Sequence, residues 1–135
     1  MAKKNDQSSP EKLFNALFLG GRGKFEAVTL NLPGGTKYTG DFLVSDWPIV
    51  GISRPVICEV KGSYRLKSHA RAATAFKAAC AIYPEFIFCW AEEQKKKDIW
   101  KVTFFHDGKQ VGDCREGTAY EILESVRSTS CMEGL

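Results

Sequence analysis

The sequence predicts an α/β fold: a single domain with a mixed central β-sheet flanked by helices. The chain of 135 residues has the length of one domain. Helical and strand-like periodicities follow one another in the order α-β-β-β-α-β-β-α, which is typical of a sheet covered by helices. A hydrophobic content of 44% and a charged content of 26% are ordinary for a globular protein. We therefore expect a core that folds without a metal or disulfide staple.

The domain is expected to span residues 10–127, between a disordered tail of residues 1–9 and a flexible tail of residues 128–135. Its first helix begins at Ser9-Pro10-Glu11, where a serine caps the helix, proline occupies the first position and an acid lies in the first turn. The glycines of residues 20–23 end it.

Three strands are expected next. Residues 24–32 alternate between apolar and polar, Pro33-Gly34-Gly35 predicts a turn, and residues 37–44 predict the returning strand. A loop over residues 45–55 leads to a strand at residues 56–60. This loop carries Trp47, Ile49 and Val50. Two interpretations stay open for these apolar residues: they cover the core, or they contact a substrate.

A long helix is expected over residues 64–83, ending before Pro84. Strands at residues 85–90 and 99–105 follow, joined by a charged hairpin tip, and a last helix is expected over residues 117–127 with Thr118 as its N-cap. The apolar positions of the long helix are Leu66, Ala70, Ala73, Phe76 and Cys80.

Composition excludes several classes of protein. Five cysteines form an odd set without CxxC spacing, and two histidines lie far from any ligand pattern, so we expect neither a zinc site nor a disulfide framework. The start of the chain has no apolar signal core, and no run reaches the ~18 apolar residues of a membrane span. The expected location is the cytoplasm. A net charge of +3 permits a polyanionic partner without requiring one.

The residues that point to chemistry are two acids and a lysine. Successive side chains of a strand alternate faces, so Glu59 and Lys61 point the same way. If residues 40–44 and 56–60 pair as neighbours, Asp41 meets Glu59 with Lys61 alongside. A Glu-x-Lys on a strand is most often a solvated ion pair. Here, however, Glu59 follows an apolar run in which an unpaired carboxylate is costly, and Asp41 stands in a strand, where aspartate is disfavoured.

This set suits phosphodiester hydrolysis. Mg²⁺ takes few carboxylates, so Asp41 and Glu59, with the carbonyl of Val60, are the predicted ligands, and Mn²⁺ is expected to substitute. Lys61 would orient or deprotonate the attacking water, or stabilise the charge of the transition state. On the helix that follows, Lys67, Arg71 and Lys77 are the candidates for contacts to DNA phosphates.

The segments around these residues resemble the PD-(D/E)XK nuclease superfamily. They are Lys24-Phe25-Glu26, residues 38–43, Glu59-Val60-Lys61-Gly62 and Tyr83-Pro84. Within this superfamily, the segments resemble phage endonuclease I and related small phage junction resolvases. The resemblance implies an αβββαβ core, Mg²⁺ on Asp41 and Glu59, water activation by Lys61, DNA as the partner, a possible homodimer and a bacterial or phage-infected cell. Gly40 departs from the family pattern, which has proline there.

A further acid on the first helix, common in the family, corresponds best to Glu11, which as a first-turn acid also complements the helix dipole. Glu26 is the competing assignment. Lys95, Lys96 and Lys97 predict a solvated turn. The leading hypothesis is a Mg²⁺-dependent DNA endonuclease, acting on branched or structured DNA. Two alternatives stay open: a catalytically inactive nucleic-acid-binding protein of the same fold, and a small phage protein that inhibits a host protein.

Overall fold

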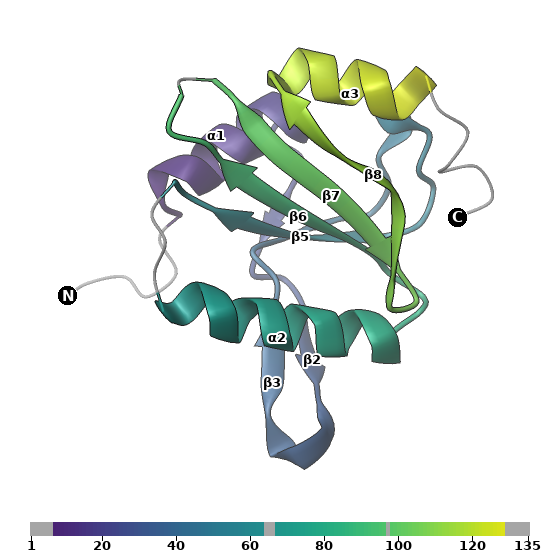
Figure 1. Ribbon diagram of the computed structural model, residues 1–135. Helices are drawn as coiled ribbons and strands as arrows, with labels where there is room; N and C mark the ends of the chain where they lie inside the picture. Colours follow the sequence, from purple (N-terminus) through teal and green to yellow (C-terminus); the bar gives the residue numbers. More distant parts are fainter. Residues whose placement is uncertain (1–6, 64–66, 97, 129–135) are drawn as a thin grey trace.

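The computed structural model describes residues 7–63, 67–96 and 98–128, in which helices cover both faces of a central β-sheet (Figure 1). The predicted fold class is confirmed. The described residues contain three α-helices, a six-stranded mixed sheet and a separate two-stranded sheet. The elements are α1 (Ser9–Phe18), β1 (Lys24–Phe25), β2 (Thr29–Asn31), β3 (Lys37–Thr39), β4 (Phe42–Val44), β5 (Val56–Lys61), α2 (Lys67–Ile82), β6 (Ile87–Glu93), β7 (Trp100–His106), β8 (Lys109–Gly117) and α3 (Ala119–Ser128).

The main sheet has the strand order β1-β4-β5-β6-β7-β8. Its one parallel pair is β5–β6, and α2 is the crossover that a parallel pair requires. The other pairs are antiparallel. Strands β2 and β3 form a hairpin that projects past α2, away from the main sheet (Figure 1). None of the described helices combines the length and the apolar character needed to cross a membrane.

The two faces of the main sheet carry separate cores. On one face, Phe14 of α1 packs with Trp47, Trp100 and the α3 residue Ile122. On the other face, Phe76 of α2 packs with the strand residues Ile57 and Phe88. Alternation along β5 sends Cys58 and Val60 to the first face and Ile57 and Glu59 to the second. The sheet face under α2 is therefore the face that carries the candidate site.

The two early strands are shorter than predicted. The expected strand at 24–32 is divided into β1 and β2, because Glu26 adopts a left-handed conformation with φ of 49°. The expected strand at 37–44 is broken at Gly40 and Asp41. The chain there leaves the small sheet and enters the main one. A Cβ atom at Gly40 would lie 2.3 Å from Cγ2 of Ile57, so proline, or any other residue with a Cβ, would require Ile57 or the backbone to shift.

Other differences are local. Helix α1 is capped by Ser8 rather than Ser9, through a capping box with Glu11, so Ser8 and Ser9 belong to the domain and not to a tail. Strand β8 was not predicted; its residues are mostly exposed and show no apolar alternation. Thr118 accepts a hydrogen bond from the amide of Glu121, which confirms it as the cap of α3. The proposed tails at residues 1–6 and 129–135 and the predicted helical residues 64–66 lie outside the described residues.

The loop before β5 belongs to the core. The side chains of Trp47 and Val50 are 1% and 2% exposed, and the indole nitrogen of Trp47 donates to the carbonyl of Phe18 at 2.9 Å. The interpretation of these two residues as a substrate-contacting surface is wrong, because packing against α1 and α3 buries them. The side chain of Ile49 lies outside the described residues. Cys58, Cys80 and Cys89 are free and buried, as expected of core cysteines.

Candidate active site

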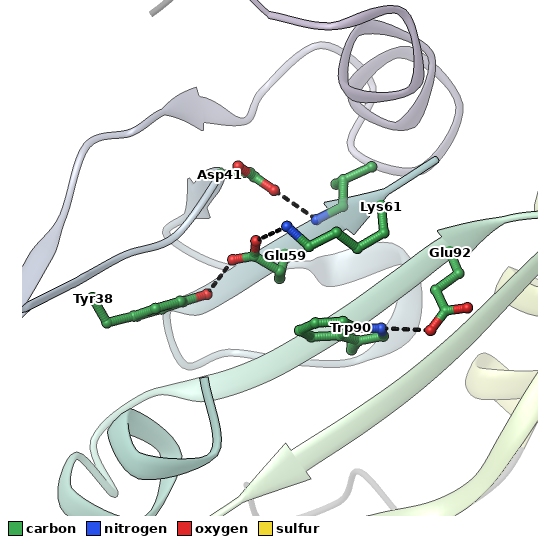
Figure 2. Close-up of polar contacts among 7 residues, drawn as sticks. Tyr38, Asp41, Glu59, Lys61, Trp90 and Glu92 are labelled. Carbon is green, nitrogen blue, oxygen red and sulfur yellow. Dashed lines mark hydrogen bonds and ion pairs between the residues drawn. The ribbon is translucent and has the colours of Figure 1, made fainter. Parts of the chain in front are cut away.

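Asp41 lies where the chain passes from the hairpin to the main sheet, directly before β4. Its Oδ2 atom accepts a hydrogen bond of 2.7 Å from the amide of Val60 (Figure 2). Its own carbonyl accepts a bond of 2.8 Å from the amide of Glu26. Because Val60 stands between Glu59 and Lys61, this contact brings the carboxylate of Asp41 to the segment of β5 that carries the other two predicted residues.

Glu59 is the one charged residue that is buried among the described residues, with 4% of its surface exposed. Both carboxylate oxygens have partners. Oε1 accepts a hydrogen bond of 2.6 Å from the hydroxyl of Tyr38, and Oε2 lies 2.7 Å from Nζ of Lys61. An unpaired buried carboxylate would be strongly destabilising, and these two contacts compensate its desolvation. They also hold the carboxylate in a defined orientation.

Lys61 lies over an aromatic ring as well as against Glu59. Its Nζ is 5.8 Å from the centroid of the Trp90 ring, a distance at which the ring attracts a cation. The indole nitrogen of Trp90 donates to Oε2 of Glu92 at 2.8 Å (Figure 2). In the parallel pairing, Glu59 is opposite Trp90 and Lys61 is opposite Glu92, so all four side chains lie on the same face of the sheet.

Glu11 contributes a third acid from the first turn of α1. Its Oε1 accepts from the amide of Ser8 at 2.6 Å, so it caps the helix as a first-turn acid would. It also raises the pKa of Asp41, by its negative charge and by hydrogen bonding to that carboxyl. The capping role of Glu11 is therefore confirmed, and its role as the additional acid of the site stays a prediction. Glu26 reaches Asp41 through its backbone amide, and its left-handed conformation removes the strand alternation on which its assignment depended.

The electrostatics of the site favour uptake of positive charge. Burial, followed by the charges of Glu59 and Glu11, raises the pKa of Asp41 from 3.8 to about 9, although the amide of Val60 acts in the opposite direction. Burial and then the charge of Glu59 raise the pKa of Tyr38, which keeps its hydroxyl as a donor. Asp41 thus holds a proton at neutral pH. Among the described residues, the centre has three acids, Asp41, Glu59 and Glu11, and only one ammonium group, that of Lys61, to balance their negative charge.

Whether these residues fit a divalent cation depends on how many ligands the ion needs. No group of three or more His, Cys, Asp or Glu side chains in the described part of the chain is arranged to hold a metal ion. Mg²⁺ is commonly bound through one or two carboxylates and retains several waters. The proton held by Asp41 marks a place where a cation would relieve repulsion between Asp41 and Glu59. The described residues do not form a closed cage, and the one or two carboxylates that an open Mg²⁺ site needs are present in Asp41 and Glu59.

The predicted phosphate-binding residues do not converge. Arg71 lines a groove between α2 and the hairpin, together with Lys37 and Thr74. Lys77 lines a different cavity, between α2 and the main sheet. The side chain of Lys67 lies outside the described residues. Lys95 and Lys96 are exposed at the turn between β6 and β7, where a solvated turn was predicted; Lys97 is outside the described residues.

Two residues of the site were missed by the sequence analysis. Tyr38 was placed in one continuous strand with Asp41, on the opposite face, and only the break at Gly40 lets both side chains reach β5. Trp90 was expected only as part of an apolar strand. Its place beside Lys61 depends on the register between β5 and β6, for which the local sequence has no signal. Comparison of the chain with protein-family models, with curated proteins and with solved structures found no match.

Proposed function

We propose that the protein is a Mg²⁺-dependent endonuclease that hydrolyses phosphodiester bonds of DNA. The observation that carries the proposal is the meeting of Asp41 with the Glu59–Lys61 pair on β5. A fold gains little stability from a buried carboxylate and a neighbouring acid that must take up a proton. Strongly perturbed carboxyls beside a lysine are more typical of a site that handles charge during a reaction.

Asp41, Glu59 and the carbonyl of Val60 would hold the ion, with Glu11 next to them. Bound there, Mg²⁺ supplies Lewis acidity and lowers the pKa of a coordinated water. Tyr38 fixes one oxygen of Glu59, so this ligand is oriented before the ion arrives. The exposed basic side chains of Arg71 and Lys37, on either side of the groove beside α2, are suited to contact the DNA backbone.

Lys61 would act on the reacting phosphate. Its ammonium is held between the Glu59 carboxylate and the Trp90 ring, with 18% of the side chain exposed. A cation that shared the Glu59 carboxylate would weaken its attraction for Lys61, and the ammonium of Lys61 would then orient the attacking water or stabilise negative charge on phosphate oxygens. A preorganised positive charge at this point is worth more than the same charge in water.

The second candidate function is a nuclease-like fold that binds nucleic acid without cleaving it. The observation that favours it is the full engagement of Glu59, whose two oxygens are held by Tyr38 and Lys61. Metal titration separates the two candidates, since an ion that binds only the native fold raises the melting temperature. DNA binding without a Mg²⁺ response that depends on Asp41 and Glu59 would favour this candidate. The host-inhibitor alternative loses the apolar loop as support, because Trp47 and Val50 are buried.

The test is cleavage of supercoiled plasmid and of a four-way junction with Mg²⁺, by the wild type and three variants: Asp41→Asn, Glu59→Gln and Lys61→Ala. We expect each variant to fall to near background, because rate enhancements by enzymes begin at ~10⁶-fold and depend on such groups. The matched controls are Asp113→Asn and Lys109→Ala, two exposed residues of β8. Equal cleavage by the wild type and all three site variants would identify a contaminant and end the proposal.

A further inference from the structure

A cavity adjoins the candidate active site on the same face of the sheet. It has a volume of about 440 Å³ and lies between the first half of α2 and strands β6 and β7. Its size is in the range of pockets that take small organic ligands. Trp90 is shared by the cavity and the candidate active site, because it lines the cavity and its ring faces the ammonium of Lys61. The remaining walls include His69, Ala73, Phe76, Lys77 and Phe105.

The aromatic wall of the cavity is held in place before any ligand enters. Phe76 meets Trp90 edge-to-face, with ring centroids 5.1 Å apart, and meets Phe105 in the same way at 5.6 Å. The indole nitrogen of Trp90 is tied to Glu92 at 2.8 Å. These contacts fix the position of the indole, while part of its surface stays accessible. A rigid, partly open indole is a good platform for stacking a planar ring.

The lining of the cavity includes both hydrogen-bond donors and an acceptor. His69 and Lys77 lie on the α2 side, and the Glu92 carboxylate lies on the sheet side. Ala70 and Ala73 occupy the part of α2 above Trp90, and their short side chains leave the space open. Nucleobases combine a flat aromatic face with edge groups that donate and accept, and single-stranded nucleic-acid sites bind them by stacking on aromatic side chains beside cations.

We propose that this cavity receives the base of an unpaired nucleotide, stacked on Trp90, and that the protein therefore prefers DNA with an unpaired nucleotide next to the cleaved bond. The inference rests on the proposed nuclease function and names its substrate class. The ring that lines the cavity is also 5.8 Å from Nζ of Lys61, so a nucleotide stacked on Trp90 would be next to the acid–lysine centre. A base inside a duplex must first be unstacked and unpaired, whereas a bulged base enters without that cost.

The experiment compares two DNA hairpins that are identical except for one added thymidine, which is bulged in the second hairpin. Binding is measured in EDTA, and cleavage is measured with Mg²⁺. The variant Ala73→Leu fills the cavity without touching the catalytic centre, and Thr74→Leu, on the neighbouring face of α2 beside the other groove, is the matched control. We expect the wild type to prefer the bulged hairpin by about 5- to 150-fold, the loss typical of one stacked base. Ala73→Leu should abolish this preference, and Thr74→Leu should keep it.

A second measurement uses the unmodified protein. Trp47 and Trp100 are buried, so quenching of tryptophan fluorescence by a short oligothymidylate should come from Trp90. Absence of quenching, or equal binding and cleavage of both hairpins by the wild type, would overturn the inference and leave the nuclease proposal standing. A preference in binding that depends on Ala73, without cleavage of either hairpin, would support the base pocket and contradict the nuclease proposal.

Discussion

Binding of Mg²⁺ should depend steeply on pH, because the ion competes with a proton on Asp41. Burial, with the charges of Glu59 and Glu11, raises the pKa of this carboxyl to about 9. At pH 7 the metal-free protein therefore carries a proton that a cation must displace. Metal ligands bind in their deprotonated form, so uptake of the ion releases that proton to the solvent.

The magnitude follows from linkage. Below the pKa of Asp41, displacement of one proton makes the association constant rise about tenfold for each pH unit, which corresponds to about 1.4 kcal/mol. Affinity should therefore increase about 100-fold between pH 6 and pH 8 and level off above about pH 9. An aspartate with its ordinary pKa of 3.8 would already be ionised throughout this range, and its site would show no such slope.

The assay is isothermal titration calorimetry of Mg²⁺ at pH 6, 7 and 8, in pairs of buffers with different ionisation enthalpies. The difference in heat between two buffers counts the protons released, and we expect one per ion at pH 7. Asp41→Asn should bind more weakly and release none, while Asp113→Asn on β8 should behave as the wild type does. A dissociation constant that does not change between pH 6 and pH 8, or an unchanged slope in Asp41→Asn, would refute the reasoning.

Three further predictions concern stability and orientation. Between pH 4 and pH 9 the folded state keeps a proton on Asp41 that the unfolded chain loses, so the melting temperature of the metal-free protein should fall as pH rises, and less so in Asp41→Asn. Tyr38→Phe removes the hydrogen-bond donor to Glu59 and keeps the aromatic ring. We expect nuclease activity to fall roughly 10- to 100-fold and the free energy of unfolding, measured in urea, to fall by ~1–3 kcal/mol. If both values stay unchanged, Tyr38 does not orient Glu59. Gly40→Ala places a methyl group against Ile57 and should lower the free energy of unfolding by ~1–3 kcal/mol. In the double variant with Ile57→Ala, the loss in urea unfolding should be smaller than the sum of the losses in the two single variants.

Local sequence determined most of the elements and the core of the candidate site. The apolar stripe and caps of α1, the long α2 and the buried run of β5 follow from periodicity that neighbouring residues carry themselves. The shared direction of Glu59 and Lys61 is a property of any strand, and it needs no knowledge of the rest of the fold. The meeting of Asp41 with these two residues was predicted only on the condition that its strand pairs with β5, and the structure has that pairing.

The tertiary structure decided which other residues join these three. A strand that looks continuous is interrupted at Gly40 and Asp41, where Gly40 lies close to Ile57, and the break lets Tyr38 reach Glu59 from a second sheet. The register of β5 against β6 brings Trp90 to Lys61. Strand β8 forms at an edge by pairing with β7, although its own sequence lacks alternation. Pairing and register depend on contacts between residues far apart in the chain, and a pattern that repeats every two or four residues carries no information about them.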